Sequence, residues 1–170
     1  MTADVPADGR LIRAVSAADG SVLRLPPELL LAEAERVRYE MLREVNGLPE
    51  ASSFGRAFQQ ATARFFRDGA QLSVLAMDGS RAAGCATICW LSLMPTYDHP
   101  SGSRAHLMNV YVRKEFRRRG IARGLVALLL EEARARGVTE ISLDATESGR
   151  PLYESLGFLP NREGMALRLS

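Results

Sequence analysis

A strand, a short basic turn and an amphipathic helix follow one another directly, and this unit most constrains the fold. Residues 104–112 have the pattern of a β-strand, and residues 120–136 carry apolar side chains at helical spacing. The turn, residues 117–122, has the sequence Arg-Arg-Arg-Gly-Ile-Ala. Because one face of the helix must pack on the sheet, we expect the N-terminus of the helix to point out of it.

The basic turn has the chemistry of an anion-binding site. The first turn of a helix leaves backbone N–H groups unpaired and carries a partial positive charge, which favours phosphate. Gly120 has no Cβ to block a ligand, and the neighbouring arginines can add charge-assisted hydrogen bonds. We therefore expect a pyrophosphate to bind here. A solvated basic loop ahead of an ordinary helix is the alternative explanation for so short a motif.

The remaining patterns predict one α/β domain over residues 11–170, preceded by a disordered or loosely ordered segment, residues 1–10. Strands that alternate with helices in the second half indicate packing around a mixed sheet. The other expected elements are a strand (11–15), two helices (28–45 and 53–68), a hairpin (70–77 and 81–93, joined by Asp-Gly-Ser), a strand (139–145), a short helix (148–156) and a terminal hairpin or strand pair (158–169).

Composition and charge exclude several classes of function. The formal net charge, 22 − 20 = +2, is too small for bulk electrostatics to favour nucleic acid. No apolar stretch approaches the ~20 residues of a membrane span, and the first ten residues lack the apolar core of a secretory signal, so we expect a cytoplasmic protein. The positive charge is concentrated in the stretch from residue 104 to residue 123, which contains the basic turn; there, seven cations stand against Glu115: Arg104, Arg113, Lys114, Arg117, Arg118, Arg119 and Arg123.

The cysteines and histidines have no spacing typical of a metal site. Cys85 and Cys89 lie four residues apart on an expected strand, so they share a face and are interpreted as free core thiols. His99 and His106 form no zinc motif with them. We expect no metal cofactor.

Two segments give the chain a resemblance to the GNAT superfamily of acetyl-coenzyme A-dependent N-acetyltransferases. The first is Val110-Tyr111-Val112 followed by an [RQ]-x-x-G-x-[GA] motif at residues 117–122, and the second is Leu-Tyr-Glu-Ser-Leu-Gly-Phe at residues 152–158, which is similar to the family's LYEKLGF segment. The resemblance covers residues 107–158. It implies an acyl-CoA acyltransferase fold with a mixed, mostly antiparallel central sheet flanked by helices. The N-terminal half, where the family sets acceptor specificity, agrees only in the order of its elements.

The resemblance implies a binding site for acetyl-coenzyme A as co-substrate. Backbone amides of residues 118–122 would hold the pyrophosphate, with arginine side chains nearby. In the family the preceding strand splays from its neighbour, often at a bulge, and frees main-chain groups for the pantetheine arm and the thioester. The residues implied to bind the co-substrate are Val110, Tyr111, Val112, Arg117, Arg118, Arg119, Gly120, Ile121, Ala122 and Arg123.

Two catalytic residues follow from the same resemblance. Tyr153 corresponds to the tyrosine that donates a proton to the departing thiolate; a half-buried tyrosine used only for packing is the alternative. His106 is the first candidate for the general base, because alternation along the strand places it on one face with Met108, Val110 and Val112; an exposed histidine at the strand end is equally compatible. Weaker candidates are Asp98, His99 and Glu40. Thr146 stands where the family often has asparagine.

These features predict direct transfer of an acetyl group to a primary amine within a ternary complex. No covalent intermediate is expected, because Cys85 and Cys89 have no evident base partner. A non-catalytic acyl-CoA-binding or regulatory module on the same fold is the alternative. A nucleic-acid-binding domain is disfavoured, since the arginine run matches no reader motif. The acceptor stays open as a small-molecule or peptide amine, and dimers are frequent in the family, which allows a homodimer.

Overall fold

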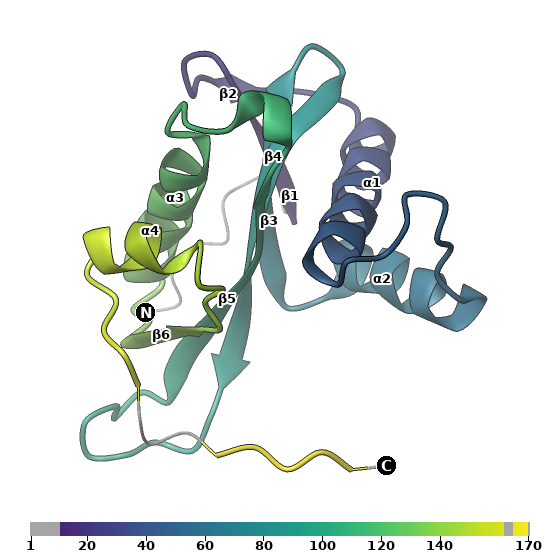
Figure 1. Ribbon diagram of the computed structural model, residues 1–170. Coiled ribbons are helices and arrows are strands. Elements are labelled where there is room, and N and C mark those ends of the chain that lie inside the picture. The colour runs from purple at the N-terminus through teal and green to yellow at the C-terminus, as the bar shows by residue number, and fades with distance from the viewer. Residues whose placement is uncertain (1–10, 162–164, 170) are drawn as a thin grey trace.

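The computed structural model describes residues 11–161 and 165–169, so the predicted loose segment, residues 1–10, lies outside the described residues. A six-stranded sheet forms the centre of the molecule, with the order β2-β1-β3-β4-β5-β6 (Figure 1). The strands are β1 (Ile12–Ser16), β2 (Val22–Leu23), β3 (Gln71–Asp78), β4 (Arg81–Ser92), β5 (Ser103–Val112) and β6 (Glu140–Leu143).

The sheet is mixed and mostly antiparallel, as predicted. Three neighbouring pairs are antiparallel (β1 with β2, β3 with β4, β4 with β5), whereas β1 with β3 and β5 with β6 are parallel. The predicted hairpin is confirmed: Asp78 pairs with Arg81, and Gly79 adopts the positive φ of 61° that such a tight turn needs.

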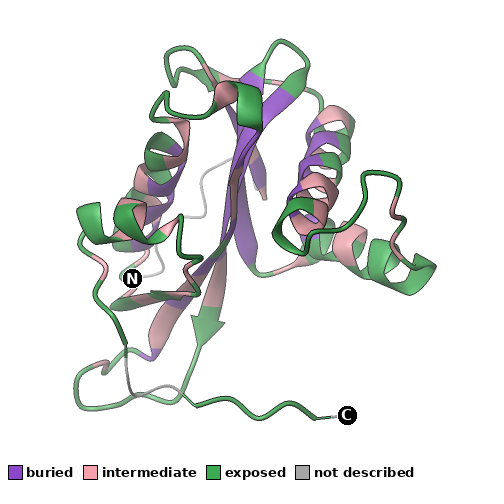
Figure 2. Cartoon of the chain, viewed as in Figure 1, coloured by how far each residue is buried: buried purple, intermediate pink, exposed green. Residues whose placement is uncertain are grey.

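Helices cover both faces of the sheet. On one side lie α1 (Pro27–Val45) and α2 (Arg56–Asp68), and on the other α3 (Ile121–Ala135) and α4 (Arg150–Ser155); the 3-10 turn η1 (Lys114–Phe116) follows β5 (Figure 1). Each side has its own apolar core. Leu125, Val126 and Leu129 of α3 pack on one face, and Leu30, Ala34 and Val37 of α1 on the other. The central strands are therefore buried on both faces (Figure 2).

The second predicted helix begins later than expected. We expected residue 53 as its N-cap, but α2 starts at Arg56, with Gly55 in the cap position. Its predicted apolar face, Phe58, Ala61 and Phe65, does not pack into a core; all three side chains line a cavity. Phe66 is the helix residue that is buried against the sheet.

β5 and β6 separate part of the way along β5. Their parallel pairing runs from Arg104 opposite Glu140 to Leu107 opposite Leu143, where β6 ends. β5 continues to Val112 without a strand on that side. This separation leaves the edge of β5 open from residue 108 to residue 112.

A β-bulge in β5 lies at the same place. Ala86 alone stands between two paired positions of β4, whereas Asn109 and Val110 stand between the matching positions of β5. Asn109 adopts a positive φ of 56°, which asparagine tolerates better than most residues. The bulge shifts the alternation by one residue, so Val110 packs with the α3-side core and Tyr111 with the α1-side core. The prediction that His106, Met108, Val110 and Val112 share one face is therefore wrong at Val110 and, since Val112 alternates with Tyr111, at Val112.

The predicted terminal hairpin is also wrong for the residues that the structure describes. Residues 159–161 and 165–169 form neither helix nor strand, and Leu167 and Leu169 are exposed. Large apolar residues do stand at every second position of this segment, at 165, 167 and 169. Alternation fits a strand, but a strand also needs a partner, and the chain here extends away from the sheet (Figure 1).

Candidate functional site

The basic turn between β5 and α3 has a main chain shaped to face a ligand. Arg118 and Gly120 both adopt positive φ values, 65° and 77°. The first bond inside α3 runs from the Gly124 N–H to the Gly120 carbonyl at 3.0 Å, so the N–H groups of residues 121–123 have no acceptor within the helix. A Cβ on Gly120 would meet no atom within 4 Å. The N-terminus of α3 is thus open, and successive N–H groups there suit an anion.

Most arginine side chains in and next to this turn form hydrogen bonds with other residues of the protein, and one points to solvent. Arg117 donates to the Glu44 carboxylate at 2.6 Å and to the Val112 carbonyl at 2.8 Å. Arg119 donates to the Glu115 carbonyl, and Arg123 donates to the Ser155 hydroxyl at 2.7 Å. Arg118 is exposed and forms no hydrogen bond or ion pair within residues 11–161 and 165–169. The turn therefore presents its main chain and Arg118 to solvent.

Two carboxylates of α1 hold the turn in place. Glu40 receives both a 2.6 Å and a 2.7 Å hydrogen bond from Arg113, whose side chain is 2% exposed. Glu44, one helical turn later, accepts from Arg117 and from the Tyr111 hydroxyl. Burial raises the pKa of Glu44, but these hydrogen bonds outweigh it, and the net pKa is lowered. Glu40 is occupied by Arg113 and does not face a cavity as a free base.

These ion pairs also reduce the charge of the basic stretch. Arg104 pairs with Glu140 at 3.2 Å, in addition to the pairs of Arg113 and Arg117 with α1. Nothing in the sequence signalled these partners, because they lie 36 or more residues away. The local excess of positive charge is thus smaller in space than along the chain.

The open edge of β5 connects the basic turn to the middle of the sheet. The Arg113 N–H donates to the Ala83 carbonyl of β4 at 2.9 Å, and Tyr111 pairs opposite Cys85 of β4. Because neighbouring residues of a strand present their main-chain groups to opposite edges, Val110 and Val112 face the open edge. The Val112 carbonyl is taken by Arg117. The groups left for a ligand are the Val112 N–H and the main chain of Val110; Tyr111 belongs to the β4 side.

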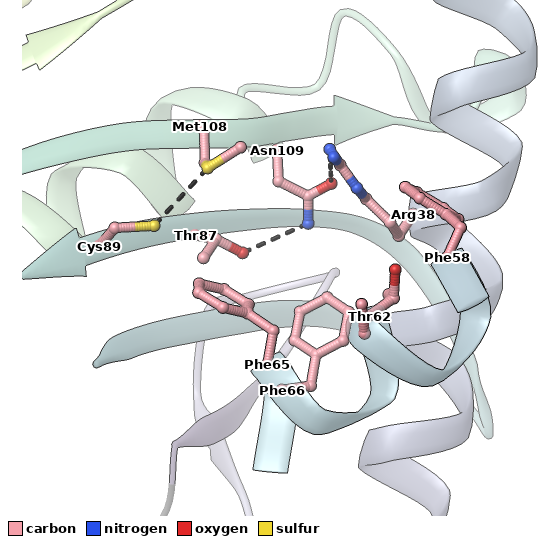
Figure 3. Close-up of a pocket in the computed structure, with 10 residues that line it drawn as sticks. Arg38, Phe58, Thr62, Phe65, Phe66, Thr87, Cys89, Met108 and Asn109 are labelled. Carbon is pink, nitrogen blue, oxygen red and sulfur yellow. Dashed lines mark hydrogen bonds between the residues drawn. The ribbon is translucent and has the colours of Figure 1, made fainter. Parts of the chain in front are cut away.

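A cavity of about 340 Å³ lies where β6 leaves β5, on the face covered by α1 and α2 (Figure 3). Four elements supply its wall: Arg38 from α1; Phe58, Ala61, Thr62, Phe65 and Phe66 from α2; Thr87 and Cys89 from β4; Met108 and Asn109 from β5. Met108 is the first β5 residue beyond the last pair with β6. The cavity and the open edge of β5 therefore meet at residues 108 and 109.

Arg38 is the one charged side chain among those that line the described cavity. It donates to the Asn109 side-chain carbonyl at 3.3 Å, and Asn109 in turn donates to the Thr87 hydroxyl (Figure 3). Burial lowers the pKa of Arg38; interactions with Cys85 and Cys89 act weakly against this lowering, and no Asp or Glu does. Burial also raises the pKa of Cys89. We did not anticipate this cavity from the sequence.

Tyr153 lies on α4, on the α3 side of the sheet. Its ring packs against the α3-side core and meets Phe158 edge-on at 5.9 Å between ring centres. Burial raises the pKa of Tyr153, which keeps the phenol protonated. Its hydroxyl forms no hydrogen bond with the residues that the structure describes. The ring is thus held by packing while the hydroxyl keeps its donor capacity.

His106 stands one pair before β5 and β6 separate. Its Nδ1 lies 2.9 Å from the Ser142 hydroxyl of β6, and its Nε2 lies 3.9 Å from a carboxylate oxygen of Asp144. It is opposite Cys89 of β4, which places it on the cavity side of the sheet, although it does not line the cavity. His99, a weaker candidate, contacts Thr139 and Glu140 instead, and the neighbouring Asp98 is exposed.

Together, an open helix N-terminus, an uncovered strand edge and a cavity define a protein that can bind an extended anionic ligand next to a second molecule. The sequence matches the acetyltransferase (GNAT) family over residues 38–158. Because that match spans well over half of the 170 residues, the chain belongs to this family.

Individual relatives support the same assignment. The chain is 30% identical over 79 residues to glucosamine 6-phosphate N-acetyltransferase of Trypanosoma brucei brucei, across 46% of this chain and 54% of that protein. It is 41% identical over 58 residues to N-acetyltransferase 8 of Homo sapiens, across 32% of this chain and 26% of that protein. The chain therefore matches about half or less of the length of these curated relatives.

Solved structures share the fold. A predicted acetyltransferase from Clostridium acetobutylicum, crystallised with acetyl-CoA, aligns with a TM-score of 0.72 and 24% identity over 81% of this chain and 89% of that one. A GCN5-related N-acetyltransferase from Ralstonia eutropha JMP134 aligns with a TM-score of 0.68 and 25% identity over 82% and 92%. Within the described part of the chain, no helix combines the length and apolar character needed to cross a bilayer.

Proposed function

We propose that this protein transfers an acetyl group from acetyl-coenzyme A to a primary amine by direct attack within a ternary complex. One observation carries the proposal: the cavity reaches β5 at residues 108 and 109, the edge of β5 is uncovered from there to residue 112, and the open N-terminus of α3 follows at residue 120. We take these three features in order as the path of the ligand. The four-residue step from Met108 to Val112 includes the bulge and so spans at most about 13 Å, the length of a regular extended strand. Such a path suits a long molecule with a pyrophosphate at one end and a thioester at the other.

The main chain would do most of the binding. The amides of residues 118–122 would donate hydrogen bonds to the pyrophosphate, and Arg118 would add a charged contact from solvent. The main-chain groups of Val110 and Val112 pair with the pantetheine arm, in the place where another strand would pair. An N–H aimed at the thioester carbonyl stabilises the negative charge that forms there. A Clostridium protein of the same fold was crystallised with acetyl-CoA, which supports acetyl-CoA as the co-substrate.

Acetyl-coenzyme A supplies an activated acyl group: the N–C bond forms as the C–S bond breaks, the sulfur gains one proton, and the nitrogen of the neutral amine loses one of its two protons and keeps the other as the amide N–H. Tyr153 donates the proton that the sulfur gains. Its raised pKa keeps that proton in place at neutral pH, and a phenol hydroxyl that has no partner among the described residues is free to give it.

His106 accepts a proton from the nitrogen through a bridging water. The Nδ1 of His106 is engaged with Ser142, which leaves Nε2 as the nitrogen available for proton transfer. The nearest carboxylate, Asp144, lies beyond hydrogen-bond distance at 3.9 Å. His106 stands outside the cavity wall, so the contact must include a water.

Calorimetry with acetyl-coenzyme A, followed by thiol release across a panel of primary amines, tests the proposal. We expect binding by the wild-type protein and turnover with at least one amine. Gly120→Ala should weaken binding by about tenfold, because a Cβ enters the ligand's space and opposes the left-handed backbone. Gly137→Ala is the matched control: Gly137 has a similar φ of 69° and open surroundings, but it follows the far end of α3.

The two variants separate backbone strain from loss of the site. Both should lose some stability, and only Gly120→Ala should lose affinity. Equal affinity in both variants would remove the basic turn from the binding site. Binding without turnover on any amine would favour the non-catalytic acyl-CoA-binding module.

A further inference from the structure

The cavity beside β5 combines an apolar wall with a single charge. Phe58, Phe65 and Phe66 of α2 and Met108 of β5 give the wall its apolar character. A pocket of about 340 Å³ is large enough for a small metabolite, since ligand pockets start at roughly 300 Å³. A ligand that fits this cavity must therefore contain a compact apolar group.

Arg38 has donors that the described residues leave unused. A guanidinium carries five N–H donors, and the structure gives Arg38 one hydrogen bond, the 3.3 Å bond to Asn109. The ion pairs of the described residues do not include Arg38, in contrast to the α1-facing Arg113 and Arg117, each of which has a glutamate partner. A partly buried guanidinium without a carboxylate is well suited to bind an anionic group of a ligand.

The position of Arg38 also restricts where the amine lies. Asn109, its hydrogen-bond partner, is the bulge residue, next to the point where β5 becomes free of β6. A carboxylate held by Arg38 would place a nitrogen on the adjacent carbon close to this opening. In α-amino acids the amine and the carboxylate share one carbon, so they meet this condition without a spacer.

We infer that the acceptor is an α-amino acid, or a close analogue, with an apolar side chain: its carboxylate binds Arg38, its side chain occupies the phenylalanine-lined wall, and its amine faces the open edge of β5. This inference rests on the proposed function, since it assigns the second substrate of the same site. A sugar phosphate has an anionic group for Arg38 but no apolar group for the wall of the cavity. An alkylamine has the apolar group but no anionic group.

Turnover on matched amines tests both halves of the inference. The panel contains L-phenylalanine and L-leucine, L-phenylalaninamide and 2-phenylethylamine without the carboxylate, glycine without the side chain, and glucosamine 6-phosphate. We expect kcat/KM for thiol release to be about 10- to 100-fold higher for L-phenylalanine than for its amide. Arg38→Met should remove this preference, and Arg38→Lys should keep part of it because the charge remains without the planar fork.

A binding measurement keeps the inference testable without turnover. 3-Phenylpropionate has the carboxylate and the ring but no nitrogen, so it can bind but cannot react. Calorimetry should show binding to the wild type and to Arg64→Met, a control in which an exposed arginine of α2 outside the cavity wall is replaced. Arg38→Met should bind it about 10-fold more weakly or worse, while its affinity for acetyl-coenzyme A stays unchanged.

The outcomes separate the two proposals. If acetyl-coenzyme A binds and no amine reacts, both the transfer reaction and the acceptor assignment fail, and Arg38-dependent binding of 3-phenylpropionate would then identify the cavity only as a site for an apolar carboxylate. If amines react without regard to the carboxylate, or if Arg38→Met binds 3-phenylpropionate as the wild type does, the inference is overturned and the acetyltransferase proposal stands. A preference for glucosamine 6-phosphate over every amino acid would overturn it as well.

Discussion

The basic turn and the cavity lie at the two ends of the proposed ligand path along β5, yet they are built from different parts of the chain. The turn presents main-chain N–H groups from a single segment, residues 118–123, while most of its arginine side chains contact other residues of the protein. The cavity presents side chains from four elements that are scattered between residues 38 and 109. A main-chain site leaves a short sequence motif, because its backbone needs particular residues in a row. A side-chain site of this kind leaves none.

Two ion pairs, Arg113 with Glu40 and Arg117 with Glu44, connect the basic end of β5 to α1, the helix that also supplies Arg38 to the cavity. Loss of such a pair should therefore destabilise the structure that supports both regions. Arg113→Met removes the buried partner of Glu40, and we expect the free energy of unfolding to fall by about 3 kcal/mol. Urea unfolding measures this. Arg81→Met is the control, because its pair with Glu115 is about half exposed on both sides and should contribute less than about 1 kcal/mol. Equal losses in the two variants would show that the α1 ion pair does not join the regions.

Tyr153 lies on the α3 side, and its replacement should alter chemistry without altering either binding region. Tyr153→Phe removes the proposed proton donor and keeps the ring contact with Phe158, so kcat should fall by about 100-fold with unchanged affinity for acetyl-coenzyme A. Because burial raises the pKa of Tyr153, wild-type kcat should have no falling limb from this group below about pH 10. Tyr97→Phe, at a fully exposed loop position, is the control. Undiminished turnover in Tyr153→Phe would exclude Tyr153 from the mechanism.

The contrast between main-chain and side-chain sites also explains what the sequence could predict. The strand, turn and helix around Gly120 were predicted correctly, because their signals are local: apolar periodicity, a glycine and a run of arginines. The bulge at Asn109 was not located, since its cause is the mismatch with β4, and it reversed the predicted face of Val110. Arg38 had no local signal at all. Its role depends on Asn109, which lies 71 residues further along the chain.

A buried thiol, Cys85, lies in the core on the cavity side of the sheet, and it should make the free energy of unfolding sensitive to alkaline pH. Burial raises the pKa of the Cys85 thiol from an ordinary 9.0 to about 12. Above pH 9 the unfolded chain loses this proton and the folded chain keeps it. The stabilisation is therefore complete below pH 9 and is lost as pH rises toward 12, with a slope that approaches about 1.4 kcal/mol per pH unit.

The Cys85→Ala variant isolates this contribution from other groups that titrate at high pH. Between pH 8 and pH 11, the free energy of unfolding in urea should fall more steeply for the wild type than for the variant. This difference in slope does not depend on how far the stabilities of the two proteins differ at pH 8. Parallel curves would mean that the thiol is not kept protonated by burial. Because the two proteins differ only at residue 85, the difference between their curves reports this thiol and not the tyrosines that also titrate at alkaline pH.

The smallest expected effect is also the most direct test of the contrast between the two regions. Arg118 is exposed and has no partner in the described part of the chain, so Arg118→Met should weaken binding of acetyl-coenzyme A by only about two- to fivefold, and less at high salt, where exposed charges are screened. Calorimetry at two salt concentrations measures this, with Arg64→Met as the control for a change in net charge.

A loss much larger than tenfold that persists at high salt would mean that side chains, not main-chain N–H groups, hold the pyrophosphate. Both ends of the path would then be side-chain sites, and the motif at residues 117–122 would owe its specificity to its arginines instead of its glycine.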